Sequence, residues 1–98
     1  MTNFTYTKKI IMDNKTPEGA DAHTDNKELY RDWYLDQVDA GLADGTKLFS
    51  EFFEWTSEST AEILVTDQAQ ADSYIAMAYA LADKMGYPLS ATVIDYPE

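Results

Sequence analysis

The sequence predicts an α+β fold in which a four-stranded antiparallel sheet carries two helices on one face. Segments of period-two alternation and segments of 3.6-residue periodicity follow one another as strand, helix, strand, strand, helix, strand. The length of 98 residues is close to the commonest size of one domain, so residues 1–98 are expected to form a single domain. Apolar residues make up 45% of the chain and aromatic residues 13%, which favours one packed core.

The first strand is predicted at residues 4–12, where aromatic and β-branched residues alternate with others. Lys8 and Lys9 lie in the middle of this run, one on each face, which indicates an edge strand or a strand end that reaches solvent. Residues 13–24 have the sequence DNKTPEGADAHT and show no period. A long polar loop is therefore predicted there.

The first helix is predicted at residues 25–40. Asp25 followed by Glu28 is an aspartate version of the capping box, and Gly41 is typical of a helix end. At 100° per residue, one side of this helix is aromatic and apolar, and we expect it to face the core. The predicted core face consists of Tyr30, Tyr34 and Val38, with Trp33 beside them.

The second helix is predicted at residues 67–85. Asp67 and Gln70 form another capping-box pattern, Gly86 ends the helix, and Pro88 prevents its continuation. One continuous stripe is expected to face the core. This stripe consists of Ala71, Tyr74, Ile75, Ala78, Leu81, Ala82 and Met85.

Three further strands complete the predicted sheet. Residues 48–56 fit both helical and strand spacing, but the preceding Asp44–Gly45 turn and the aromatic content favour a strand. This strand forms a hairpin with residues 60–66, and residues 89–94 are the last strand. The order resembles the ferredoxin-like βαββαβ topology, and right-handed crossovers would place both helices on one face. Unrelated functions share that topology, so it implies no activity.

Net charge is the strongest compositional signal, with 18 acidic residues, 7 basic residues and a formal charge of −11. Such a charge opposes direct binding to nucleic acid or anionic lipid, and it favours a basic protein partner or serves solubility alone. The absence of cysteine excludes disulfides, thiolate nucleophiles and cysteine-ligated zinc, and is compatible with a cytoplasmic protein. No membrane contact is expected, because no segment approaches the roughly 20 apolar residues needed to span a bilayer.

The first predicted helix carries a row of five carboxylates spaced 3, 4, 4 and 3 residues apart. This spacing keeps them within about 60° of one line, at intervals of about 6 Å where the spacing is four, similar to successive phosphates of a nucleic-acid strand. Trp33 is a candidate anchor beside them, although packing on the sheet is the favoured interpretation of the aromatic residues of this helix. An ordinary solvated helix face is the alternative for the row. The candidate partner-binding residues are Asp25, Glu28, Asp32, Trp33, Asp36 and Asp39.

No catalytic residue, cofactor or metal is predicted. The chain lacks GxSxG, HExxH and glycine-rich phosphate-loop motifs, so an enzyme is not expected. His23 is the single histidine, and in an extended loop Asp21, His23 and Asp25 would point the same way, as metal ligands could. An exposed loop histidine without a ligand is the favoured interpretation.

The sequence therefore predicts a small acidic binding protein, an inhibitor or adaptor that docks on a basic surface such as that of a nucleic-acid-binding protein. Size, charge and missing catalytic motifs resemble those of phage- or plasmid-encoded proteins that block host defence or nucleic-acid enzymes, which implies a DNA-mimic role. The alternative is a structural subunit that forms a homodimer or larger assembly through its sheet face or edge, with the aromatic residues 49–55 in contact.

Overall fold

The computed structural model describes residues 6–43 and 51–96, which form four strands and three helices. The α+β class and the four-stranded antiparallel sheet are confirmed. The elements in chain order are β1 (Lys8–Asp13), α1 (Pro17–Asp25), α2 (Lys27–Asp39), β2 (Phe53–Trp55), β3 (Thr60–Val65), α3 (Gln68–Met85) and β4 (Ser90–Asp95).

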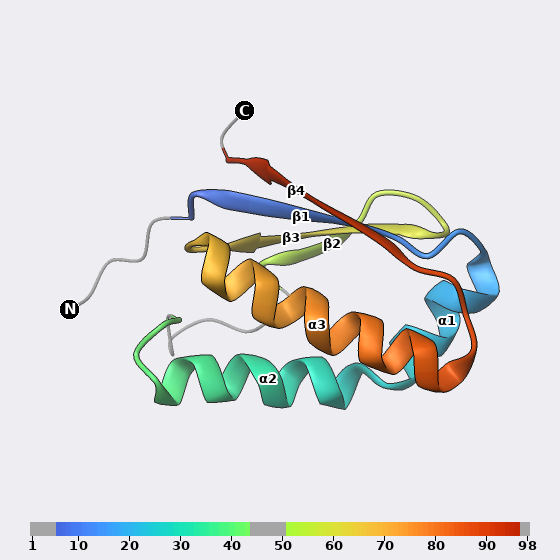
Figure 1. Ribbon diagram of the computed structural model, residues 1–98, viewed down its shortest axis with the longest axis horizontal. Helices are drawn as coiled ribbons and strands as arrows, with labels where there is room; N and C mark the ends of the chain where they lie inside the picture. Colours follow the sequence, from blue (N-terminus) through green and yellow to red (C-terminus); the bar gives the residue numbers. More distant parts are fainter. Residues whose placement is uncertain (1–5, 44–50, 97–98) are drawn as a thin grey trace.

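The sheet has the strand order β2-β3-β1-β4, and every neighbouring pair is antiparallel. The two strands that precede helices, β1 and β3, are therefore central. Ile10 lies opposite Ile63 of β3 and Val93 of β4, so these three side chains share one face of the sheet. The helices cover that face, with α1 at one end (Figure 1). The α2 helix contacts both α3, where Trp33 meets Tyr74, and the β2 side of the sheet, where Tyr34 lies 5.6 Å from Phe52.

The prediction of two helices is wrong, because the segment predicted as a long polar loop contains α1. The element order therefore has one helix more than the predicted ferredoxin-like βαββαβ order. Thr16 is the N-cap of α1, and its hydroxyl oxygen accepts from the Gly19 N–H at 3.0 Å. Pro17 occupies the first helical turn, where a backbone N–H would have no partner within the helix, so its absence costs nothing. The negative charge of Glu18 interacts favourably with the positive N-terminal end of the helix dipole.

The predicted helix at residues 25–40 is also shorter than expected. Asp25 is the last residue of α1, and α2 begins at Lys27 after Asn26, whose side chain makes no N-capping bond. The capping box expected from Asp25 and Glu28 is therefore wrong. The chain bends at Asn26, so Asp25 does not belong to the same helix as the other carboxylates.

The α3 helix agrees with its prediction at both ends. Asp67 is the N-cap, and its Oδ1 accepts from the Gln70 N–H at 2.8 Å. Gly86 adopts the left-handed conformation with φ of 80°, which glycine tolerates without strain. Its N–H donates to the carbonyl of Ala82 at 2.9 Å and closes the helix.

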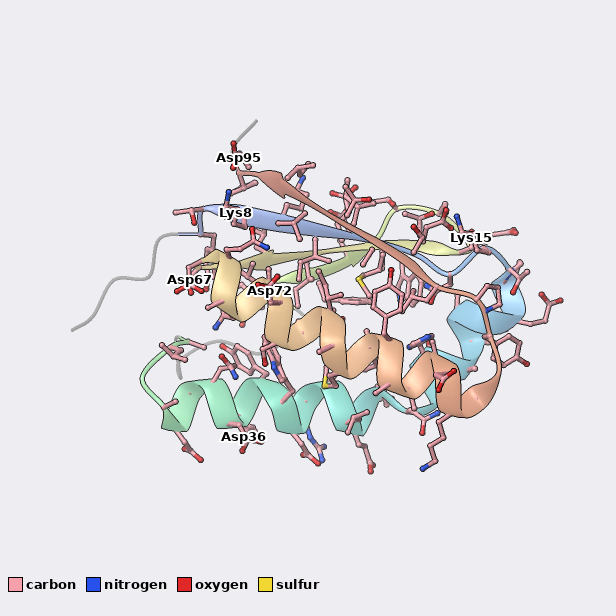
Figure 2. All side chains as sticks on the ribbon, viewed as in Figure 1. Lys8, Lys15, Asp36, Asp67, Asp72 and Asp95 are labelled. Carbon is pink, nitrogen blue, oxygen red and sulfur yellow. The ribbon has the colours of Figure 1, made fainter. Side chains whose placement is uncertain are left out.

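Of the two interpretations of Lys8 and Lys9, the edge position is wrong, because β1 lies between β3 and β4. The two lysines are instead the first residues of β1, at one end of the strand. Neighbouring strands supply the counter-charges: Lys8 Nζ lies 2.6 Å from Asp95 Oδ1. Figure 2 shows these two labelled residues next to each other at one end of the sheet. On the opposite face, Lys9 Nζ lies 3.0 Å from Glu62 Oε1. The hydrogen bond from Lys8 lowers the pKa of the Asp95 carboxyl.

Strand boundaries differ from their predictions by a few residues. The first strand spans Lys8–Asp13 instead of residues 4–12, and positions 4 and 5 lie outside the described residues. Residues 48–50 of the strand predicted at 48–56 lie outside the described residues. Within residues 51–56, the strand covers Phe53–Trp55. It pairs with β3 as the predicted hairpin, and β4 covers Ser90–Asp95.

The core lies between the sheet and the three helices. Strand residues on the covered face meet the apolar stripe of α3 and the tyrosines of α2. The buried residues of this core are Ile10, Met12, Tyr30, Ile63, Val65, Ala71, Tyr74, Ala78 and Leu81. Within residues 6–43 and 51–96, no helix has the length and apolar character needed to cross a membrane.

Candidate functional site

A cavity of about 440 Å³ lies between the covered face of the sheet and the junction of α1 with α2. We call it the His23 cavity. Its size falls within the range of sites that hold small molecules, roughly 300–1,000 Å³. Most of its wall is apolar, contributed by Met12, Phe53, Trp55, Ala61 and Tyr74.

Strand pairing explains why there is space at this position. Ala61 lies opposite Met12 on one side and opposite Trp55 on the other, so a methyl group stands between two large side chains. Alternation along the strands turns all three toward the helices. Trp55 lies on the short edge strand β2 and is 38% exposed, so its indole lies where the cavity meets solvent.

His23 and Tyr30 form the polar part of the wall. His23 is 7% exposed, and its Nδ1 is hydrogen-bonded to the Tyr30 hydroxyl. Burial raises the pKa of the Tyr30 hydroxyl and lowers the pKa of the His23 imidazole, so both groups are neutral at pH 7. A phenol is a better donor than acceptor, so we assign the donor role to Tyr30 and the imidazole proton to Nε2.

The Nε2 atom of His23 is buried and has no hydrogen-bond partner among the described residues. An unsatisfied buried donor costs on the order of 1–3 kcal/mol, which a ligand acceptor would recover. With its proton on Nε2 and Nδ1 occupied, the imidazole can donate a hydrogen bond but cannot abstract a proton. The arrangement therefore suits ligand binding better than general-base catalysis.

The remaining polar side chains divide into those already bonded and those at the mouth. The Asn14 amide donates to the Ser59 carbonyl at 3.1 Å, and the Thr24 hydroxyl donates to a carbonyl within α1 at 3.1 Å. Three charged, exposed residues from the first two turns of α2 also line the cavity. These are Lys27, Glu28 and Arg31.

Four of the predicted partner-binding residues are carboxylates of α2, and one of them, Glu28, also lines the mouth of the His23 cavity. Glu28, Asp32, Asp36 and Asp39 are all exposed, and Figure 2 shows Asp36 on the side of α2 that faces away from the sheet. The α2 helix thus carries an acidic outer face, although Arg31 Nη2 lies 3.7 Å from Asp32 Oδ1.

The other two predicted partner-binding residues are not part of that face. Asp25 ends α1, one residue before the chain bends. Trp33 packs between α2 and α3: its Nε1 donates to Ser73 Oγ at 3.0 Å, and its ring meets Tyr74 edge-on at 5.2 Å. Its indole N–H is therefore already engaged within the chain.

The prediction of an exposed loop histidine is wrong, because His23 lies on a helix and is buried. In a helix, residues two apart point about 200° away from each other, so His23 faces inward while Asp21 and Asp25 are exposed. Across residues 6–43 and 51–96, no three His, Asp or Glu side chains form a group that could hold a metal ion.

Acidification is expected to destabilise the chain through His23. The unfolded histidine, with a pKa of about 6.5, takes up a proton that the buried imidazole resists. Stability is therefore full above that pH and falls as the pH drops toward the lower folded pKa, by at most about 1.4 kcal/mol per pH unit. Urea unfolding at pH 7.5, 6.5 and 5.5 measures the slope, and His23→Gln is the control because it removes the single histidine. Equal slopes in both chains would contradict the burial of His23.

The cavity was missed because its residues come from six elements and only the fold brings them together. A local signal was present, since Thr16, Pro17 and Glu18 form a helix start. A helix from Pro17 places Gly19, Ala20 and His23 on one buried side. Comparison of the chain with family models, curated proteins and solved structures gives no match.

Proposed function

We propose that this chain is a non-enzymatic binding protein that holds a small, largely apolar molecule in the His23 cavity. The observation that carries the proposal is a mostly apolar cavity of about 440 Å³ with a few polar groups in its wall. Ligand sites are commonly concave, mainly apolar and supplied with a small number of placed polar groups. The neutral His23–Tyr30 pair provides such groups without a charge to desolvate.

A titration with 2-naphthylmethanol, a neutral aromatic probe, tests the proposal. We expect saturable binding, followed by the NMR signal of the Trp55 indole N–H at the mouth of the cavity. Ala61→Leu should weaken binding at least tenfold, because the added carbons occupy the space between Met12 and Trp55.

The matched control is Ala91→Leu, which adds the same atoms to the sheet on the other side of Met12. Ala91 does not line the cavity, so this variant should bind the probe as the parent chain does. No binding to the parent chain, or equal binding to the Ala61→Leu variant, would show that the cavity is not the site.

The second candidate function is docking of a basic protein on the acidic outer face of α2, as expected of an inhibitor, adaptor or DNA mimic. It is supported by the exposed carboxylates and by Leu29 and Leu35, which are 42% and 50% exposed on the same helix. Replacing Asp32, Asp36 and Asp39 with Asn distinguishes protein docking from small-molecule binding. It removes three negative charges from α2 and changes no residue that lines the cavity. That variant should keep probe binding.

We further propose that α1 and α2 together occupy the place of the first helix in a ferredoxin-like βαββαβ arrangement. We also propose that the protein is cytoplasmic. The central positions of β1 and β3 support the fold assignment. Self-association through the sheet remains an alternative. Phe53 and Trp55, which are expected to form that contact, also line the His23 cavity.

A further inference from the structure

The mouth of the His23 cavity carries positive charge in a strongly acidic chain. Lys27 and Arg31 are two of the seven basic residues in a chain of formal charge −11, and both line this cavity. They stand one helical turn apart on α2, so their side chains leave the same side of the helix. Glu28 is the only carboxylate in the lining.

These cations are weakly compensated within the described part of the chain. Arg31 meets Asp32 at 3.7 Å, and both side chains are more than 60% exposed, so solvent screens the pair. Among the described residues, neither Lys27 nor Glu28 has an oppositely charged side chain within 4 Å. Both cationic groups can therefore engage a ligand.

Hydrogen-bond roles inside the cavity favour a ligand that brings acceptors. The Thr24 hydroxyl and one N–H of the Asn14 amide are already bonded within the chain, and Tyr30 donates to His23. The donors of the lining for which the described residues show no such bond are His23 Nε2, the second N–H of the Asn14 amide, the Trp55 indole N–H, Lys27 and Arg31. Because Nε2 is not exposed in the unliganded chain, a ligand contacts it only after a small movement of the wall.

The apolar wall favours a flat body. Phe53 and Trp55 meet edge-on at 5.4 Å, and Tyr30 and Tyr74 lie 5.5 Å apart, so a further ring would find four aromatic side chains in the lining. Aromatic rings favour such offset and edge-to-face contacts. Lys27, Arg31 and Glu28 together give the mouth one net positive charge, which matches a ligand with a single carboxylate. The guanidinium of Arg31 can bind the ligand carboxylate through two parallel hydrogen bonds.

We propose that the ligand of the His23 cavity is a small aromatic carboxylate, with its ring between the aromatic side chains and its carboxylate at Lys27 and Arg31. This inference rests on the proposed function and specifies the chemical class of the molecule bound. Two acidic residues of α2 are close to this site, since Glu28 lines the mouth and Asp32 lies 3.7 Å from Arg31. Salt weakens the repulsion from more distant exposed carboxylates, because the Debye length is about 8 Å at physiological salt.

Three probes with one ring system test this class: 2-naphthoate, 2-naphthamide and protonated 2-naphthylmethylamine. We expect 2-naphthoate to bind at least tenfold more tightly than the amide, and the ammonium probe to bind most weakly. Lys27→Met and Arg31→Met should each reduce the preference for carboxylate over amide several-fold. Lys84→Met, an exposed change in the last turn of α3, should leave it unchanged.

The outcomes separate this inference from the proposed function. If amide and carboxylate bind equally, or if the ammonium probe binds best, the cavity binds small molecules but the carboxylate class is wrong. If no probe binds to the parent chain, the proposed function fails as well. Circular dichroism of each variant checks that the fold is retained, so a loss of preference reports on the charge at the mouth.

Discussion

Replacing Tyr74 with alanine is expected to destabilise the chain by about 3–5 kcal/mol, the usual range for deleting a buried aromatic side chain. Tyr74 is 2% exposed at the centre of the core. Its ring lies 5.5 Å from that of Tyr30 and 5.2 Å from that of Trp33, so one side chain joins α3 to α2. Because small domains have a total stability of about 5–15 kcal/mol, the variant is expected to be largely or partly unfolded at 37 °C.

Urea unfolding at 25 °C, followed by circular dichroism, measures this loss. The matched control is Tyr87→Ala, since Tyr87 is 37% exposed just after the end of α3. Its replacement is expected to change the free energy of unfolding by less than about 1 kcal/mol. Similar losses in the two variants would mean that α2 does not pack on α3 through Tyr74.

The α3 helix shows what local sequence signals can predict. An N-cap aspartate, a long apolar stripe and a glycine end all act within a few residues, and the helix begins and ends beside Asp67 and Gly86 as expected. The β2–β3 hairpin followed from equally local alternation. Where helix and strand periods were clear and the ends carried caps, prediction and structure agree.

The α1 helix shows how the same signals were misread. Pro17 and Gly19 were interpreted as loop residues, although proline is favoured in a first helical turn. Gly19 fits there for a different reason, because a Cβ at this position would lie 3.0 Å from the Asn14 carbonyl oxygen, which is a tight contact. The glycine therefore allows the helix to pack against the end of β1.

The positions of the charged residues of the sheet and of the cavity residues depend on contacts between distant parts of the chain, which local sequence patterns do not predict. Lys8 and Lys9 indicate an edge strand or a strand end, and counter-charges from β4 and β3 make them compatible with the end of a central strand. The partner of Lys8 is 87 residues away in sequence. The pairing of His23 with Tyr30 likewise depends on the bend at Asn26, which no periodicity predicted.

Replacing Gln70 with methionine is expected to destabilise the chain by roughly 2–4 kcal/mol, although the two side chains have similar volume. Gln70 is 7% exposed, and its Oε1 accepts from the Thr66 N–H at 2.9 Å and from the Thr66 hydroxyl at 3.1 Å. Its Nε2 donates to Gln37 Oε1 at 3.1 Å and to the Leu42 carbonyl at 3.0 Å. One side chain thus joins the start of α3 to the end of α2.

This role differs from the capping box predicted for Asp67 and Gln70, because Gln70 bonds to Thr66 and to the end of α2 instead of returning to the Asp67 N–H. The N-cap bond from the Gln70 N–H to Asp67 involves only the backbone of residue 70 and survives the substitution. Urea unfolding should therefore show a lower midpoint with unchanged helix content in the folded state. Gln68→Met, an exposed change in the same turn, is the control and should shift stability by no more than about 0.5 kcal/mol. Equal effects of the two substitutions would mean that α2 and α3 are joined by their aromatic contacts alone.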